Sequence, residues 1–116
     1  MHELPFAKSI YKSVMEVAEA NSATHIHRVV LEVGVLRDFV PELVQRYWNY
    51  ISKGSIAEGS EIVMNTIDAS AVCDHCGTTY PIDTHNFHDA HCPSCGHNRG
   101  RLLTGRELKI INIEIS

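Results

Sequence analysis

The chain has 116 residues, of which 44% are hydrophobic and 21% charged, and this suits one folded core with a small additional segment. The formal net charge is −4 and no stretch concentrates Lys and Arg, so a surface built for nucleic-acid phosphates is not expected. No apolar run is long enough to span a bilayer and the N-terminus lacks the pattern of a secretory signal, so we expect a cytoplasmic protein without membrane contact.

The first predicted element is a helix that begins between Glu3 and Pro5 and ends near Asn21. Pro5 fits only near the start, where its missing N–H removes no helical hydrogen bond. Apolar residues recur every three to four positions, as on one face of a helix: Phe6, Ile10, Val14 and Val17. We interpret this face as part of the core, with a partner-binding face as the alternative.

Two strands and a second helix follow. Residues 26–34 are mostly β-branched or apolar and end at Gly34, which predicts a strand. A helix is predicted to start between Asp38 and Pro41 and to stop at Lys53-Gly54. Its apolar face consists of Leu43, Val44, Tyr47, Trp48 and Ile51. Residues 61–68 alternate well enough for a second strand.

The chain ends with a third predicted strand at residues 106–116, which is too short and apolar to stand alone. We expect it to return to the sheet formed by the first part of the chain. Residues 1–69 and 105–116 would then form one α/β domain, and residues 70–104 an inserted domain. Exchange of this strand between chains would produce a homodimer, and the sequence leaves monomer and homodimer open.

The insertion contains two Cys-x-x-Cys pairs, Cys73 with Cys76 and Cys92 with Cys95, separated by fifteen residues. Each pair can direct two thiolates at one ion, and two pairs complete the tetrahedral shell that Zn²⁺ prefers. Cytoplasmic reducing conditions favour metal ligands over disulfides. Gly77 and Gly96 follow the pairs, where such turns favour positive φ. We therefore predict a structural zinc site.

Other uses of these cysteines are less consistent with the pattern. A redox pair would sit at a helix start after a strand, and a catalytic zinc would keep an open position for water. The apolar residues of the insertion are few, so zinc should supply most of its folding free energy: Val72, Tyr80, Ile82, Phe87, Leu102 and Leu103. His75, His91 and His97 lie beside the cysteines and could replace a ligand or bind a further metal.

The N-terminal sequence Met1-His2-Glu3 offers a second kind of metal site. The terminal amine, the backbone amide of His2 and its imidazole Nδ1 can close two chelate rings, and the Glu3 amide can supply a fourth nitrogen. Such a nitrogen plane suits Ni(II) or Cu(II) and suits Zn²⁺ poorly. A histidine at position 2 can also be incidental, so this motif alone does not establish a site.

The combination of MHEL at the N-terminus, AKSI at residues 7–10, and the doubled Cys-x-x-Cys before a β-forming tail resembles the HypA/HybF family. These are nickel-incorporation accessory proteins for hydrogenase and, in some bacteria, urease. The resemblance covers the whole chain. It implies a small α+β fold, with a mixed three-stranded sheet, two helices on one side, and an inserted four-cysteine zinc-knuckle or ribbon subdomain.

Carried over to this sequence, the resemblance implies nickel binding at Met1, His2 and Glu3, and zinc binding by the four cysteines. The Glu3 side chain would tune the nickel site or contact a partner. His97 is the nearest match to a histidine that contributes to nickel in some relatives. Pro5-Phe6 stands where relatives often have Ser-Leu, which affects the helix start and not the chelating atoms.

The function predicted on this basis is nickel delivery for maturation of [NiFe]-hydrogenase, without catalysis. Expected partners are a HypB-type GTPase and the hydrogenase large subunit. The alternative is a zinc-ribbon module that binds nucleic acid or acts in transcription, with Arg99, Arg101 and Arg106 along one side. A zinc hydrolase that uses the histidine cluster is a third reading, without a convincing nucleophile and base to support it.

Overall fold

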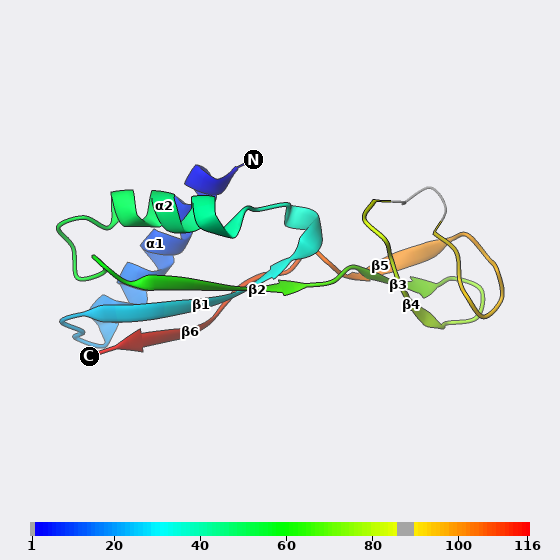
Figure 1. The fold of residues 1–116 in the computed structure, drawn as a ribbon. Coiled ribbons are helices and arrows are strands. Elements are labelled where there is room, and N and C mark those ends of the chain that lie inside the picture. The colour runs from blue at the N-terminus through cyan, green and yellow to red at the C-terminus, as the bar shows by residue number, and fades with distance from the viewer. Residues whose placement is uncertain (1, 86–89) are drawn as a thin grey trace. The chain divides into compact units, whose positions relative to one another are not determined.

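The computed structural model describes residues 2–85 and 90–116, so Met1 and Phe87 lie outside the described residues. Figure 1 shows an α+β fold with two three-stranded sheets. In chain order its elements are α1 (Glu3–Ala20), β1 (Ile26–Gly34), the 3-10 helix η1 (Val35–Arg37), α2 (Pro41–Ile51), β2 (Glu61–Ile67), β3 (Ser70–Cys73), β4 (Thr79–Pro81), β5 (Gly100–Thr104) and β6 (Leu108–Ile115).

The chain divides into two compact units. The first comprises Met1–Glu32, Asp38–Asn65 and Lys109–Ser116, and the second comprises Val33–Arg37 and Thr66–Leu108. The predicted bounds of β1 agree with the structure, because its β-branched run specifies an extended chain. The helix α1 begins at Glu3, with Pro5 in its first turn.

The first sheet has the strand order β2-β1-β6, so the C-terminal strand returns to it as predicted. Strands β1 and β2 run in the same direction and β6 runs opposite to them, which makes the sheet mixed (Figure 1). The antiparallel pair is closed at both ends: Ser116 N donates to His25 O at 2.9 Å, and Gly34 N donates to Glu107 O at 2.8 Å. The parallel pair is connected through α2, as parallel strands require a crossover.

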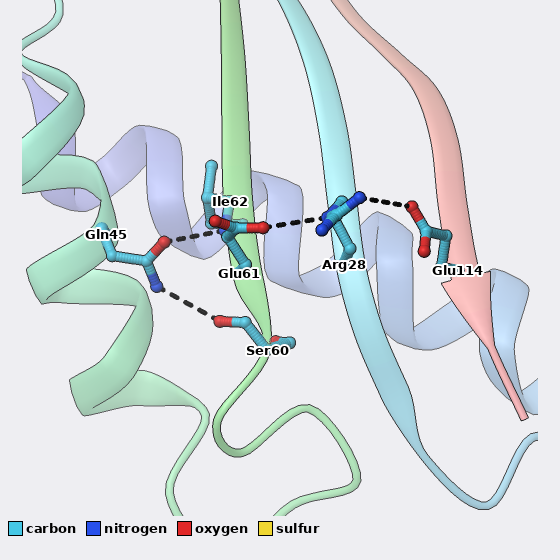
Figure 2. A network of polar contacts seen from close by, with 6 residues as sticks. All are labelled: Arg28, Gln45, Ser60, Glu61, Ile62 and Glu114. Carbon is cyan, nitrogen blue, oxygen red and sulfur yellow. Dashed lines mark hydrogen bonds and ion pairs between the residues drawn. The ribbon is translucent and has the colours of Figure 1, made fainter.

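Both helices cover one face of this sheet. Helix α1 packs against α2, and alternate residues of β1 within the first unit are buried: Val29 and Leu31. Trp48 of α2 is fully buried, and its Nε1 donates to Ser60 Oγ at 2.8 Å. Gln45 joins α2 to the start of β2, since its Nε2 donates to Ser60 O and its Oε1 accepts from Ile62 N (Figure 2).

The opposite face of the sheet carries an exposed ion-pair ladder. Arg28 of β1 bridges Glu61 of β2 at 2.9 Å and Glu114 of β6 at 3.3 Å, as Figure 2 shows. The three side chains are about half exposed, with 48%, 58% and 45% of their surface accessible. Such pairs contribute little to stability, but they identify the face that no described helix covers.

One residue of the predicted core face of α1 is not buried. Val17 continues the apolar spacing of α1, yet 45% of its surface is exposed, whereas Ala18 is fully buried. Val17 lies with Ile111 and Ile113 along an open groove between α1 and β6. Because β6 is an edge strand, the described chain places no further strand against which Val17 could pack.

The second unit contains the sheet β4-β3-β5, in which both neighbours of β3 are antiparallel. Its buried cluster is small: Ala71, Cys73, Tyr80 and Cys92, with Ile82 packed against it. Leu102 and Leu103 are among the apolar residues predicted for the core of the insertion, but they are 37% and 55% exposed.

Within the described part of the chain, no helix is both long enough and apolar enough to cross a membrane.

Candidate metal sites

The structure brings together the sulfur atoms of Cys73, Cys76, Cys92 and Cys95. All four Sγ atoms lie within 4.8 Å of one another. The Sγ atoms of Cys73 and Cys95 are 3.6 Å apart, and those of Cys76 and Cys92 are 3.5 Å apart. Four sulfurs that surround one Zn²⁺ at about 2.3 Å are about 3.8 Å apart, whereas a disulfide would require about 2.05 Å. The donor set therefore fits a tetrahedral zinc ion.

Two similar turns present the cysteines. In the first, Gly77 N donates to Cys73 O at 3.0 Å, and in the second Gly96 N donates to Cys92 O at 2.8 Å. Both glycines have a φ of 75°, in the left-handed region that a side chain disfavours. In each turn the first cysteine, Cys73 or Cys92, is buried and the second is exposed.

The four thiols and their neighbours shift the pKa values of Cys76 and Cys95 in opposite directions. The Thr78 hydroxyl, 3.2 Å from Cys76 Sγ, is the main cause that lowers the pKa of Cys76 to about 6. The backbone N–H of His97 lowers the pKa of Cys95, but burial and the neighbouring sulfurs outweigh it and raise that pKa to about 12. Four close sulfurs cannot all be thiolates unless a cation neutralises part of their charge. Thr78 was not singled out from the sequence.

The histidines beside the cysteines are not brought into the sulfur cluster as ligands. His75 and His97 stack on each other across the two turns, with ring centroids 5.4 Å apart and planes 26° from parallel. Among the described residues, the only group of three or more His, Cys, Asp or Glu side chains suited to one ion is the four cysteines. His91 is exposed and directly precedes Cys92.

The second predicted site lies at the start of α1, and of its residues Met1 is outside the described part of the chain. His2 is exposed and occupies the N-cap position without a side-chain capping bond. The hydrogen-bond ladder of the helix starts with Phe6 N donating to His2 O at 3.2 Å. The amides of His2 and Glu3 thus precede the first amide donor of the ladder, as at any helix N-terminus.

Glu3 is placed differently from its neighbour. It is only 3% exposed, and its Oε2 accepts a hydrogen bond from Val40 N at 2.9 Å. This bond is the main cause that lowers the pKa of the Glu3 carboxyl. Since Val40 is the N-cap of α2, the carboxylate connects the starts of the two helices. The structure therefore gives the Glu3 side chain an anchoring contact between the two helices, and its expected role in tuning the nickel site or contacting a partner stays a prediction.

Comparison with known proteins gives a consistent match along the chain. Residues 1–115 match the family model described as "Hydrogenase/urease nickel incorporation, metallochaperone, hypA". The hydrogenase maturation factor HypA of Acidithiobacillus ferrooxidans is 32% identical over 115 residues, and that of Chlorobium phaeobacteroides is 35% identical over 115 residues. Each comparison covers 99% of both chains.

A solved structure agrees at the level of the fold. The solution structure of the nickel metallochaperone HypA from Helicobacter pylori superimposes with a TM-score of 0.65, covering 99% of this chain and 97% of that one. The sequence identity is 19%, so this likeness supports the arrangement of helices and strands and not the roles of single residues.

Proposed function

The chain belongs to the HypA family of nickel metallochaperones for hydrogenase maturation, a family without enzymatic activity, and we propose that it carries Ni(II) at its N-terminus. The ligands would be the amine of Met1, the amide and imidazole of His2 and the amide of Glu3. The observation that carries this proposal is the position of His2, exposed at the N-cap of α1 and before the amide ladder of the helix.

The electrostatics of the helix end suit this ligand set. Two amide nitrogens that have lost their protons bring two negative charges, so the planar Ni(II) complex is neutral overall. The N-terminus of a helix carries a partial positive charge, which stabilises such anionic nitrogens close to it. Because the amides must be deprotonated, nickel binding should weaken as the pH falls.

The Glu3 side chain would hold the proposed nickel site in place through its hydrogen bond to α2. Its bond to Val40 N holds the first turn of α1 against the start of α2, and so fixes the direction in which the chelating residues leave the helix. The exposed terminus remains accessible for transfer. We propose that nickel is exchanged with a HypB-type GTPase in the cytoplasm and passed to the hydrogenase large subunit, with urease as a second client to be tested.

The four cysteines would hold a resident zinc ion with a structural role. Their spacing fits a closed tetrahedral shell that leaves no position for a substrate. Zinc would supply charge neutralisation and cross-link the two cysteine turns. Membership of the HypA family argues against the alternative of a nucleic-acid-binding module. One of the arginines considered for that alternative, the exposed Arg101, pairs with Asp74, with its Nε 3.6 Å from Oδ1.

The test is a nickel titration of the zinc-loaded protein with its native N-terminus. The wild type should bind a planar, diamagnetic Ni(II), and His2→Gln should lose it. Gln is preferred to Ala because a small second residue would promote removal of Met1. N-terminal acetylation removes the amine donor and keeps His2, so it should also abolish planar binding. His85→Ala, which removes an exposed histidine in the second unit, is the matched control. Planar nickel that persists in His2→Gln would refute the proposal.

A further inference from the structure

A pair of histidines outside both sites is arranged for metal binding. His25 and His27 flank the first residue of β1, and their rings meet edge to face with centroids 4.5 Å apart and planes at 71°. His27 is exposed and His25 is half-buried, so an ion from solvent can reach them. Two nitrogens that bind one ion at about 2.1 Å must lie within about 4 Å of each other, which side-chain rotation permits at this ring separation.

The backbone that carries the pair is fixed on both sides. Ser116 N donates to His25 O at 2.9 Å, and Ser116 O accepts from His25 N at 3.2 Å and from Thr24 N at 2.7 Å. On the other side, Ile26 N donates to Ile56 O at 2.9 Å. The two imidazoles therefore start from a defined spacing, and binding an ion requires ordering of side chains and not of the chain itself.

A further contact orients one of the rings. His27 Nε2 lies 2.9 Å from Ser116 Oγ, within hydrogen-bond distance. A hydrogen bond at one ring nitrogen fixes the ring orientation and leaves the other nitrogen available, as occurs for histidines that ligate metals. Nδ1 of His27 and a nitrogen of His25 are thus the candidate donors.

We propose that His25 and His27 form a second, weaker site for a divalent transition metal, with Ni(II) as the ion that this protein would meet. In the described part of the chain no third His, Cys, Asp or Glu joins the pair, so water fills the other positions and the ion exchanges readily. Imidazole suits Ni(II), Cu(II) and Zn(II), with Cu(II) bound most tightly. Helix α1 has 18 residues and is about 27 Å long, so the pair at its far end is a distinct site.

The coordination geometry makes this site distinguishable from the N-terminal one. Two imidazoles with several waters give octahedral Ni(II), which is paramagnetic and broadens NMR signals nearby, whereas the planar N-terminal complex is diamagnetic. This readout does not depend on whether the N-terminal proposal is correct.

The experiment is a Ni(II) titration of the zinc-loaded full chain followed by amide NMR. We expect broadening centred on residues 24–28, 56 and 116, in the wild type and equally in His2→Gln. His25→Ala and His27→Asn should each weaken the effect at least tenfold, while His85→Ala should leave it unchanged. Undisturbed amide positions elsewhere would show that the variants are folded. Broadening that is absent from this region, or that survives in the His25→Ala/His27→Asn double variant, would overturn the proposal.

Discussion

Removal of zinc should unfold the second unit and leave the first unit intact. Among the described residues, the buried cluster around β3 contains one large side chain, Tyr80, and two of its four members are the cysteines Cys73 and Cys92. Full burial of one large side chain contributes about 1.5–3 kcal/mol, while structural zinc contributes about 10–16 kcal/mol at pH 7. Fixing the backbone costs about 1–2 kcal/mol per residue, so the small core cannot replace the metal.

The two units have separate reporters. Trp48 is the single tryptophan, and it is fully buried in the first unit beside Ser60. A zinc chelator should therefore abolish hydrogen-exchange protection at Tyr80 and its neighbours in β3 and β5 without changing Trp48 fluorescence. Cys92→Ser should reproduce this result in the presence of zinc, and Ser94→Ala, in the same turn, should not.

Two outcomes would refute this reasoning. If the amides of β3 stay protected after zinc is removed, the small apolar core is sufficient and the metal is not structural. If Trp48 fluorescence changes in the same step as zinc release, the two units unfold together and the division of the chain does not describe its stability.

Two further predictions concern single residues. Glu3→Gln should speed hydrogen exchange at Val40 and weaken nickel binding, because Val40 N loses a charged acceptor. Since folding lowers the pKa of Glu3 below its ordinary 4.5, its contribution to stability is present above that value and is lost as the pH falls through the folded-state pKa. Acid titrations of wild type and Glu3→Gln should therefore converge at low pH, and a constant difference would contradict this role. Gly100→Ala should destabilise the second unit by about 1–3 kcal/mol and speed zinc release to a chelator, because a Cβ would lie 2.5 Å from the Tyr80 hydroxyl and 2.9 Å from Val72 O; unchanged release would refute this.

The sequence predicts most elements correctly because they depend on local chemistry. The β-branched run of residues 26–34 specifies an extended strand, and Pro41 marks the start of α2. The two Cys-x-x-Cys pairs indicate tetrahedral metal chemistry because the covalent spacing within each pair limits where the sulfurs can point. The 3-10 helix at Val35–Arg37 carries no such local signal and was not predicted.

Errors arise where burial depends on what lies opposite a residue. Periodicity identifies the apolar face of α1, but it cannot show that the sheet ends at β6, which leaves Val17 exposed. Leu102 and Leu103 are apolar in sequence, yet the three short strands around β3 offer too little surface to cover them.

By itself, the sequence determined the class of fold, the order of its main helices and strands, and the clustering of four cysteines suited to one metal ion, while nickel binding at the N-terminal motif stays a prediction. Only the tertiary structure showed that Glu3 anchors α1 to Val40, 37 positions away, and that Ser116 meets His27 across 89 positions. The physical reason is that local propensity and covalent spacing act over a few residues, whereas hydrogen bonds between distant residues exist only after the sheet has closed and the helices have packed.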